Sequence, residues 1–226
     1  MERLTSDWRR AHDYCAQRAL YALVFATGLA LFLLASRIVH TWSGSHLGLA
    51  WNLVLAWVPY AASLRAESLY RRWPRRPWRL LLPGALWLAF LPNGPYLITD
   101  LWYLHGGLSG PLWFDIGLLA LLALTGLTLG TLSLRVMQRL VAAYLGRLVS
   151  WLFVLVSVGL SGLGVYLGRF LRWNSWDLFL RPGDVLADIA APLASPADHV
   201  HAFAFVALYA AIILFAYLTL TSGERC

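Results

Sequence analysis

The sequence predicts an all-α integral membrane protein, a single bundle of about six transmembrane helices with an ordered outer loop. Two observations from composition predict it: 60% of the 226 residues are hydrophobic, and only 13% are charged. A soluble domain of this length needs a larger share of polar residues to cover its core. The third observation is that the apolar residues form runs near the roughly 20 residues that a helix needs to cross a bilayer. Lipid offers the backbone no hydrogen-bond partners, so each run is expected to be helical.

Six apolar segments are expected to cross the membrane. They lie at residues 19–39, 47–64, 80–98, 112–134, 148–168 and 200–220. The second segment is the shortest and carries Asn52 and Pro59. The first follows basic residues, as the core of a secretory signal does, but no small-residue cleavage site precedes Arg37. We therefore interpret the first segment as a retained helix.

The arginines predict which side of the membrane each loop occupies. All 18 basic residues are arginine, and 14 of them fall on the inner side if the N-terminus is cytoplasmic. The positive-inside rule favours this orientation. We expect a cytoplasmic N-terminal segment at 1–18, a transmembrane domain at 19–220 and a cytoplasmic tail at 221–226. Cys15 and Cys226 then lie in a reducing compartment, where a disulfide is not expected.

The loop from Arg65 to Arg79 carries six of the arginines on the predicted inner side. We interpret it as a topology anchor that contacts anionic lipid of the bilayer. A protein or nucleic-acid partner is the alternative explanation of so basic a loop. The distribution of the arginines over the inner loops argues against nucleic acid, and we expect no nucleic-acid partner.

Polar residues near helix ends gather on the predicted outer side. The cluster consists of Asn52, Asn93, Thr99, Asp100, His105, Asp115, Arg169, Arg172, Asn174 and Asp177. A charged side chain at the centre of a bilayer costs roughly 2.5–3.5 kcal/mol on insertion scales. Asp115 and Arg169 stand at the edges of apolar segments, so they are expected to face the bundle or each other.

Arg169 and Arg172 stand three residues apart, which places both on one face of a helix. An aspartate partner is expected for them, and Asp100, Asp115 and Asp177 are the candidates. One interpretation is a structural latch of paired Arg and Asp side chains. The other is an anion-binding or catalytic pocket that the same groups line.

A PN-x-PY element interrupts the third apolar segment. Pro92 and Pro95 each remove a backbone donor and disfavour helix at the residue before them. The helix is therefore expected to break near Asn93, whose amide could supply a partner for a freed carbonyl. Such a break either ends the helix at the interface or lines a cavity.

The longest outer loop, about 170–199, has the pattern of ordered structure. Ser175 is expected to cap a short turn, and Pro182 to open an amphipathic helix that reaches about Ala191. Ser195 and Asp198 have the spacing of a capping box at the start of the last segment.

Glycine pairs stand four residues apart in the fourth and fifth segments. They are Gly126 with Gly130 and Gly164 with Gly168. Small residues at this spacing allow helix backbones to approach each other. We therefore predict that the fourth and fifth segments are in contact.

No motif points to a metal, a cofactor or a nucleophile. His199 and His201 form an H-x-H pair, but a helix would direct them to different faces, and no further zinc pattern supports them. The chain carries no G-x-S-x-G, no P-loop and no dinucleotide fingerprint. We expect neither metal nor cofactor.

Three blocks, LPNGPYLITDL, WFD and LGRFLRWNSWD, identify a resemblance. They begin at Leu91, Trp113 and Leu167. Together they resemble a bacterial multi-pass membrane family catalogued as a domain of unknown function, number 1361 in that series, over about residues 45–220. The family usually has Ala where this chain has Gly94, and often Tyr where it has Phe114. The resemblance implies a protein of the bacterial cytoplasmic (inner) membrane and carries no catalytic assignment.

Two functional hypotheses follow. In the first, the protein is an accessory or assembly subunit, whose outer polar cluster fixes the fold or docks a membrane protein partner. In the second, it is a membrane enzyme or transporter that handles a lipid-linked or anionic solute at the extracytoplasmic face. The two differ in whether Arg169 and Arg172 are fully paired in a dry bundle or point into an open cavity.

Overall fold

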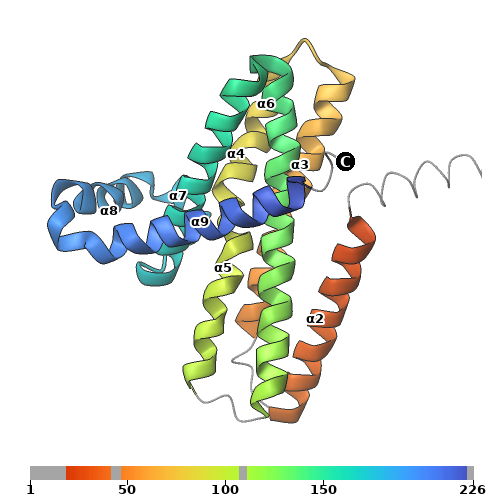
Figure 1. Cartoon of the computed structure of the whole chain (residues 1–226), viewed down its shortest axis with the longest axis vertical. Coiled ribbons are helices and arrows are strands. Elements are labelled where there is room, and N and C mark those ends of the chain that lie inside the picture. The colour runs from red at the N-terminus through yellow and green to blue at the C-terminus, as the bar shows by residue number, and fades with distance from the viewer. Residues whose placement is uncertain (1–18, 42–46, 107–110, 223–226) are drawn as a thin grey trace, which may run out of the picture.

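The computed structural model describes residues 19–41, 47–106 and 111–222, and within these ranges the secondary structure is helical (Figure 1). The helices in chain order are α2 (Leu20–Thr41), α3 (Leu47–Arg72), η2 (Pro77–Leu80), α4 (Leu81–Phe90), α5 (Asn93–Thr99), η3 (Asp100–Gly106), α6 (Leu112–Phe170), α7 (Asp177–Leu180), α8 (Pro182–Ala194), η4 (Pro196–His199) and α9 (Val200–Ser222). Within the described ranges, five helical segments are long and apolar enough to cross a membrane. The predicted all-α multi-pass bundle is therefore confirmed.

The longest of these segments, α6, is two helices joined at Gly146. It runs for 59 residues, but Gly146 has φ 84° and ψ 174°, which no helix contains. Glycine adopts this left-handed φ without the clash that a Cβ introduces. At 1.5 Å per residue, the halves 112–145 and 147–170 are roughly 50 Å and 35 Å long. Each half contains one predicted segment, but the first continues past residue 134 because Arg135 and Arg139 interrupt the apolar run and not the helix.

Two apolar clusters form the core. The first joins α2 and α3 to α5 and the first half of α6, and its most buried members include Leu34, Leu53 and Leu122. The second joins α3 and α4 to both halves of α6 and to α9. At its centre lies Trp87, which is 1% exposed. Its Nε1 donates to Ser133 Oγ at 3.1 Å, and its ring stacks on Phe153 with centroids 5.4 Å apart, so one side chain connects both halves of α6.

The glycine pairs of α6 pack closely against the third apolar segment. A Cβ at Gly94 would meet the carbonyl oxygen of Gly126 at 2.7 Å and the Cα of Gly130 at 3.3 Å. A Cβ at Gly164 would likewise overlap the ring of Pro92. Both halves contribute to the second apolar cluster, but the glycines serve a different contact from the one predicted. They admit the backbone of α5, which the proline break brings close.

Helices α8 and α9 project to one side of the bundle, and α9 crosses α6 on its way back to it (Figure 1). α8 begins at Pro182 as predicted and continues to Ala194. The helical stretch before α9 begins after Ser195 as predicted, but the Ser195 side chain makes no cap hydrogen bond. His199 Nδ1 instead lies 3.0 Å from the Ser195 carbonyl oxygen, so the expected capping box is wrong in its mechanism.

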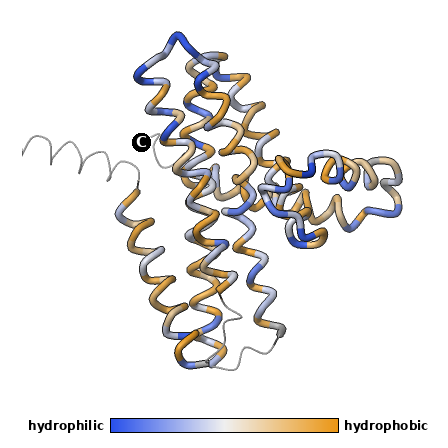
Figure 2. The backbone as a smooth tube through the Cα atoms, turned by 180° about the vertical axis from the view of Figure 1, so that it is seen from behind, coloured by the Kyte–Doolittle hydropathy of each residue, from blue (hydrophilic) through white to orange (hydrophobic). Residues whose placement is uncertain are grey.

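The two turns that carry most of the arginines predicted on the inner side lie at one end of the molecule. Tyr144, just before Gly146, donates its hydroxyl to the carbonyl of Pro74 at 2.8 Å. The rings of Tyr70 and Tyr144 are also in edge contact, with centroids 5.2 Å apart. Figure 2 shows the hydrophilic turn after α3 at one tip of the long axis, beyond largely apolar helices.

Candidate functional site

The break in the third apolar segment positions one wall of the site. α4 ends at Phe90 and α5 begins at Asn93, as the PN-x-PY element predicts. The Gly94 N–H bonds to the Leu91 carbonyl at 3.3 Å, which leaves the Phe90 carbonyl without its usual partner. Asn93 Nδ2 donates to that carbonyl at 3.0 Å, so the predicted role of the amide is confirmed. The same nitrogen donates to Ser175 Oγ at 2.8 Å, which ties the break to the loop after α6.

A cavity of about 780 Å³ lies beside this break. α3, the α4–α5 break, the second half of α6, the loop 171–176, α7 and α8 all contribute to its lining. Five members of the predicted polar cluster line it, namely Asn52, Asn93, Arg169, Arg172 and Asn174. Its volume is in the range of small-molecule sites. The cavity brings together residues that are more than 100 positions apart in the sequence.

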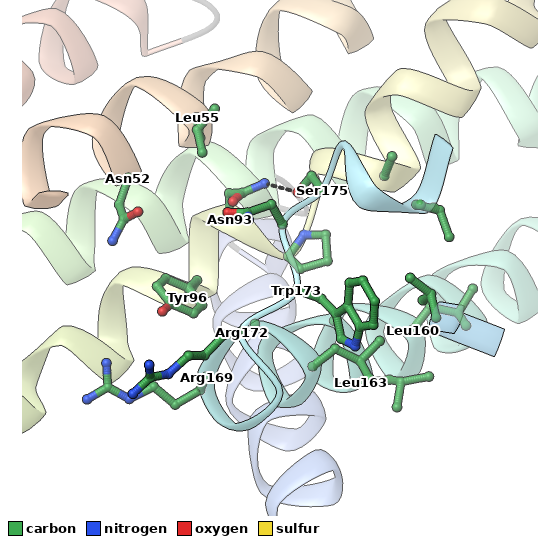
Figure 3. A pocket seen from close by; sticks show the side chains of 18 of the residues that line it. Asn52, Leu55, Asn93, Tyr96, Leu160, Leu163, Arg169, Arg172, Trp173 and Ser175 are labelled. Carbon is green, nitrogen blue, oxygen red and sulfur yellow. Dashed lines mark hydrogen bonds between the residues drawn. The ribbon is translucent and has the colours of Figure 1, made fainter. Parts of the chain in front are cut away.

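The two sides of the cavity differ in polarity. Figure 3 shows the side chains of Arg169 and Arg172 extending in the same direction, on the side of Tyr96. Trp173 lies away from them, together with Leu160 and Leu163. The cavity is therefore amphiphilic, with cationic groups on one side and aliphatic and indole groups on the other.

Arg169 lies beside a buried carboxylate. Its Nη1 lies 4.0 Å from Asp100 Oδ1, and Asp100 is 1% exposed. Asn52 Nδ2 donates to the other oxygen of Asp100 at 3.2 Å. Of the three predicted aspartate partners, Asp100 is thus the one that the fold brings to Arg169. The contact is longer than a hydrogen bond, so Asp100 offsets the charge of Arg169 without fixing the guanidinium.

Arg172 is held in a backbone conformation that is unusual for arginine. Its φ is +60°, in the left-handed region. The N–H of Trp173 bonds to the Leu167 carbonyl, six positions earlier, at 3.2 Å, and a left-handed residue just past a helix end is usually glycine. A non-glycine residue costs about 1–2 kcal/mol there. Arg172 is exposed, lines the cavity and forms no ion pair within the described ranges, so the predicted aspartate partner is wrong for this residue.

The apolar side of the cavity includes two leucines with exposed surface. Leu88 of α4 is 39% exposed and Leu160 of α6 is 44% exposed, although both line the cavity. Both lie inside candidate membrane spans. Their exposed faces are aliphatic, which suits contact with lipid chains. The lining therefore includes aliphatic side chains of candidate membrane spans that keep exposed surface.

α8 covers a further wall and is held by an indole. Trp173 Nε1 donates to Asp188 Oδ2 at 2.7 Å, and the Arg181 guanidinium lies over the Trp173 ring at 4.9 Å from its centroid. Val185 of α8 is 4% exposed and lines the cavity. One hydrogen bond and one cation–π contact thus connect α8 to the loop that follows α6.

Asn174 and Asp177 form a turn at the edge of the cavity. The backbone N–H of Asn174 donates to Asp177 Oδ2 at 2.9 Å, and Arg181 Nη2 lies 3.3 Å from Asp177 Oδ1. The hydrogen bond from Asn174 and the contact with Arg181 hold the pKa of Asp177 below its ordinary value. Asp177 therefore stabilises this turn through contacts with its neighbours. The predicted side-chain cap by Ser175 is absent, because Ser175 accepts from Asn93.

Asp115 lies in a separate ion pair. Arg37 Nη2 donates to Asp115 Oδ2 at 2.8 Å, and each side chain is 2% exposed. Sequence reasoning placed Asp115 with Arg169 and Arg172 and missed Arg37. The available signal was that Arg37 ends the first apolar segment on the same predicted side as Asp115. The Thr99 hydroxyl bonds to the backbone, since it donates to the Tyr96 carbonyl at 2.7 Å.

Two aromatic residues in the lining were also missed, namely Tyr96 and Tyr103. Tyr96 belongs to the PN-x-PY element, which was the signal for it. The side chain of His105 lies outside the described residues. In the described ranges, no three His, Cys, Asp or Glu side chains gather as a metal site would require.

Comparison with known proteins assigns a family to the chain. The family described as "Protein of unknown function (DUF1361)" matches residues 51–216. The chain belongs to this family, and the resemblance of its three sequence blocks is confirmed. No curated protein and no solved structure matches the chain.

Proposed function

We propose, for this member of a family without an assigned function, that the amphiphilic cavity binds a lipid-linked anion. One observation carries the proposal. A single cavity of about 780 Å³ joins two arginines to aliphatic residues that are exposed on membrane helices. A molecule with an anionic head and an apolar chain matches both sides at once.

The charges of the lining support an anionic head. Arg169 is paired with Asp100 at 4.0 Å, whereas Arg172 lines the cavity without an ion-pair partner among the described residues. The two arginines and one carboxylate leave a net positive charge. Planar guanidinium groups bind phosphate and carboxylate through two parallel hydrogen bonds. Asn52, Asn93 and Asn174 add amides to the same side.

The strain at Arg172 also supports a role for its side chain. Glycine would occupy a φ of +60° without cost, and the chain keeps an arginine there. Non-glycine residues in the left-handed region concentrate at functional sites. The side chain offsets the backbone strain if it contributes to binding.

The exposed leucines support a lipid link. Leu88 and Leu160 line the cavity, lie inside candidate membrane spans and keep exposed surface. A soluble anion needs no such surface, whereas a lipid-linked one enters laterally with its chain in the bilayer. If the positive-inside orientation holds, the binding face is extracytoplasmic. The proposal thus places the handling of such a solute at the outer face of a bacterial inner membrane.

The accessory or assembly role stays a prediction with a different basis. The buried pair of Arg37 and Asp115 favours a structural latch, which is one part of that hypothesis. The other part is a membrane protein partner. Purification in mild detergent tests it, because a solitary monomer in every preparation would count against an assembly role.

A matched pair of ligands tests the binding proposal. Binding of a polyprenyl phosphate and of the corresponding polyprenol is measured on the full chain in detergent. The wild-type protein is expected to prefer the phosphate, and Arg172→Gln to reduce that preference about tenfold, as for one charge-assisted hydrogen bond. Arg76→Gln, which removes an exposed arginine near the other end, is the control. Equal affinity of the wild-type protein for both ligands would refute the proposal.

A further inference from the structure

A second cavity, of about 340 Å³, lies at the turn between the two halves of α6. Its lining comes from the end of the first half, the start of the second half and the end of α9. Along the second half of α6, Arg147 and Arg169 are roughly 33 Å apart at 1.5 Å per residue. The second cavity is therefore distinct from the amphiphilic cavity and lies at the opposite end of that helix.

Helical spacing and the turn at Gly146 gather three arginines around this cavity. Arg135, Gln138, Arg139 and Ala142 line it, and their spacing places them on one face of the first half. The left-handed turn at Gly146, with φ 84°, then brings Arg147 of the second half to the same cavity. Three guanidinium groups thus converge on one space from two helices.

Besides the arginines, the amide of Gln138 offers the cavity a further donor. The Tyr217 hydroxyl donates to Gln138 Oε1, which occupies the amide oxygen and leaves the amide nitrogen as a donor. The buried Ser150 hydroxyl donates to the Arg147 carbonyl at 2.8 Å. The Trp151 and Tyr217 rings are in edge contact at 6.2 Å and form an apolar wall. The described lining residues include no Asp or Glu.

We infer that this cavity binds a phosphate group, and that the phosphate belongs to a membrane phospholipid. Phosphate offers the several strong acceptors that three arginines and an amide donor match. The cavity lies at the turn between the two halves of α6 and at the end of the candidate span Ala197–Thr221, near the arginine-rich turn that Tyr144 connects through Pro74. In the positive-inside orientation this end faces the cytoplasmic leaflet, whose lipids are anionic. The inference stands independently of the amphiphilic cavity.

Native mass spectrometry of the full chain in mild detergent tests the inference. Phosphatidylglycerol and phosphatidylcholine are added in turn, and retained lipid is counted. The wild-type protein is expected to retain one phosphatidylglycerol in preference to phosphatidylcholine. Arg139→Gln with Arg147→Gln is expected to weaken that retention about tenfold or more. Both side chains are exposed, so the fold is expected to survive the change.

The control removes the same charge from the neighbouring turn. Arg75→Gln with Arg76→Gln also deletes two exposed arginines near this end. An equal loss of retention in both double variants would overturn the inference, because diffuse attraction would then explain binding. Equal retention of both lipids by the wild-type protein would overturn it as well. If the double variant fails to fold, Arg147→Gln alone is measured in the same way.

A second arm distinguishes the source of the phosphate. Thermal unfolding is followed while inorganic phosphate or phosphatidylglycerol is added. A rise in Tm with phosphatidylglycerol alone supports a lipid phosphate. A rise with inorganic phosphate that Arg147→Gln abolishes supports the phosphate site and assigns it to a soluble anion. No rise with either probe would overturn the site. Arg75→Gln with Arg76→Gln, on the neighbouring turn, is expected to leave these responses unchanged.

Discussion

Arg37 and Asp115 form a buried ion pair across 78 positions of sequence, with Nη2 donating to Oδ2 at 2.8 Å. Each side chain is 2% exposed, and the pair joins the end of α2 to the first turn of α6. α2 is also attached by the hydrogen bond from Trp57 Nε1 to Thr27 Oγ1 at 3.1 Å and by apolar side chains such as Leu23 and Leu34. The ion pair therefore adds a buried charged contact at the far end of α2.

Removal of one partner is expected to destabilise the protein strongly. Asp115→Asn leaves a buried guanidinium without its carboxylate, which costs about 3–5 kcal/mol in comparable buried pairs. Chemical unfolding in detergent measures the free energy of unfolding. The double variant Arg37→Met with Asp115→Leu is expected to recover most of that loss, because both charges are gone. Arg71→Gln is the control, since its pair with Glu67 is exposed and worth about 1 kcal/mol or less. An equal effect of Asp115→Asn and Arg71→Gln would contradict the latch.

Arg172→Gly is expected to separate stability from binding. Glycine relieves the left-handed φ of +60°, so the free energy of unfolding should rise by about 1 kcal/mol. Loss of the guanidinium should at the same time weaken binding of a polyprenyl phosphate. The two measurements are unfolding by denaturant and ligand binding on the same preparation. A fall in stability would show that the side chain has a structural role that its exposed position does not suggest.

Gly126→Ala is expected to disturb the contact between α5 and α6. The new Cβ would lie 2.5 Å from Leu97 Cδ1 and would also overlap the backbone of Gly94. Overpacking of this kind costs about 1–3 kcal/mol. Gly117→Ala is the matched control in the same half of α6, because no atom lies within 4 Å of its Cβ position. Alanine there should be neutral or stabilising, as helix propensity predicts. Comparable loss in both variants would contradict the close approach of α5.

The turn of Asp177 is expected to lose stability in acid. Its pKa is lowered in the folded protein by the Asn174 N–H and by Arg181, so its contribution is fully present above the ordinary pKa of an aspartate. That contribution is lost as the pH falls through the lowered value. The measurement is the difference in Tm between the wild-type protein and Asp177→Asn as a function of pH. The difference should be constant near neutral pH and shrink below about pH 4. A difference that grows in acid would refute the assignment.

Sequence reasoning predicted the features that depend on local chemistry. Two prolines three residues apart remove backbone donors wherever they stand, so the break at Asn93 and the use of its amide followed directly. The apolar segments followed from composition in the same way, and so did the start of α8 at Pro182. These features need no knowledge of which helix packs on which.

The features that depend on how helices are rotated and packed were not predictable. In the sequence, Asp100 and Asp115 are equally suitable partners for Arg169. Only the packing of α2 assigns Asp115 to Arg37. The glycines of α6 predicted a close helix contact but did not identify α5 as the partner. The left-handed backbone at Arg172 has no sequence signal at all, because glycine is the residue expected there.

The Asn93 amide donates two hydrogen bonds, which has a mechanical consequence. Its two protons reach the Phe90 carbonyl on the broken helix and the Ser175 hydroxyl on the loop after α6. Those two walls of the amphiphilic cavity are therefore connected by one side chain. The same loop is joined to α8 by the hydrogen bond from Trp173 to Asp188. Side-chain hydrogen bonds thus connect the broken helix, the loop and α8 in series, so a guest that displaces one wall also pulls on the other two.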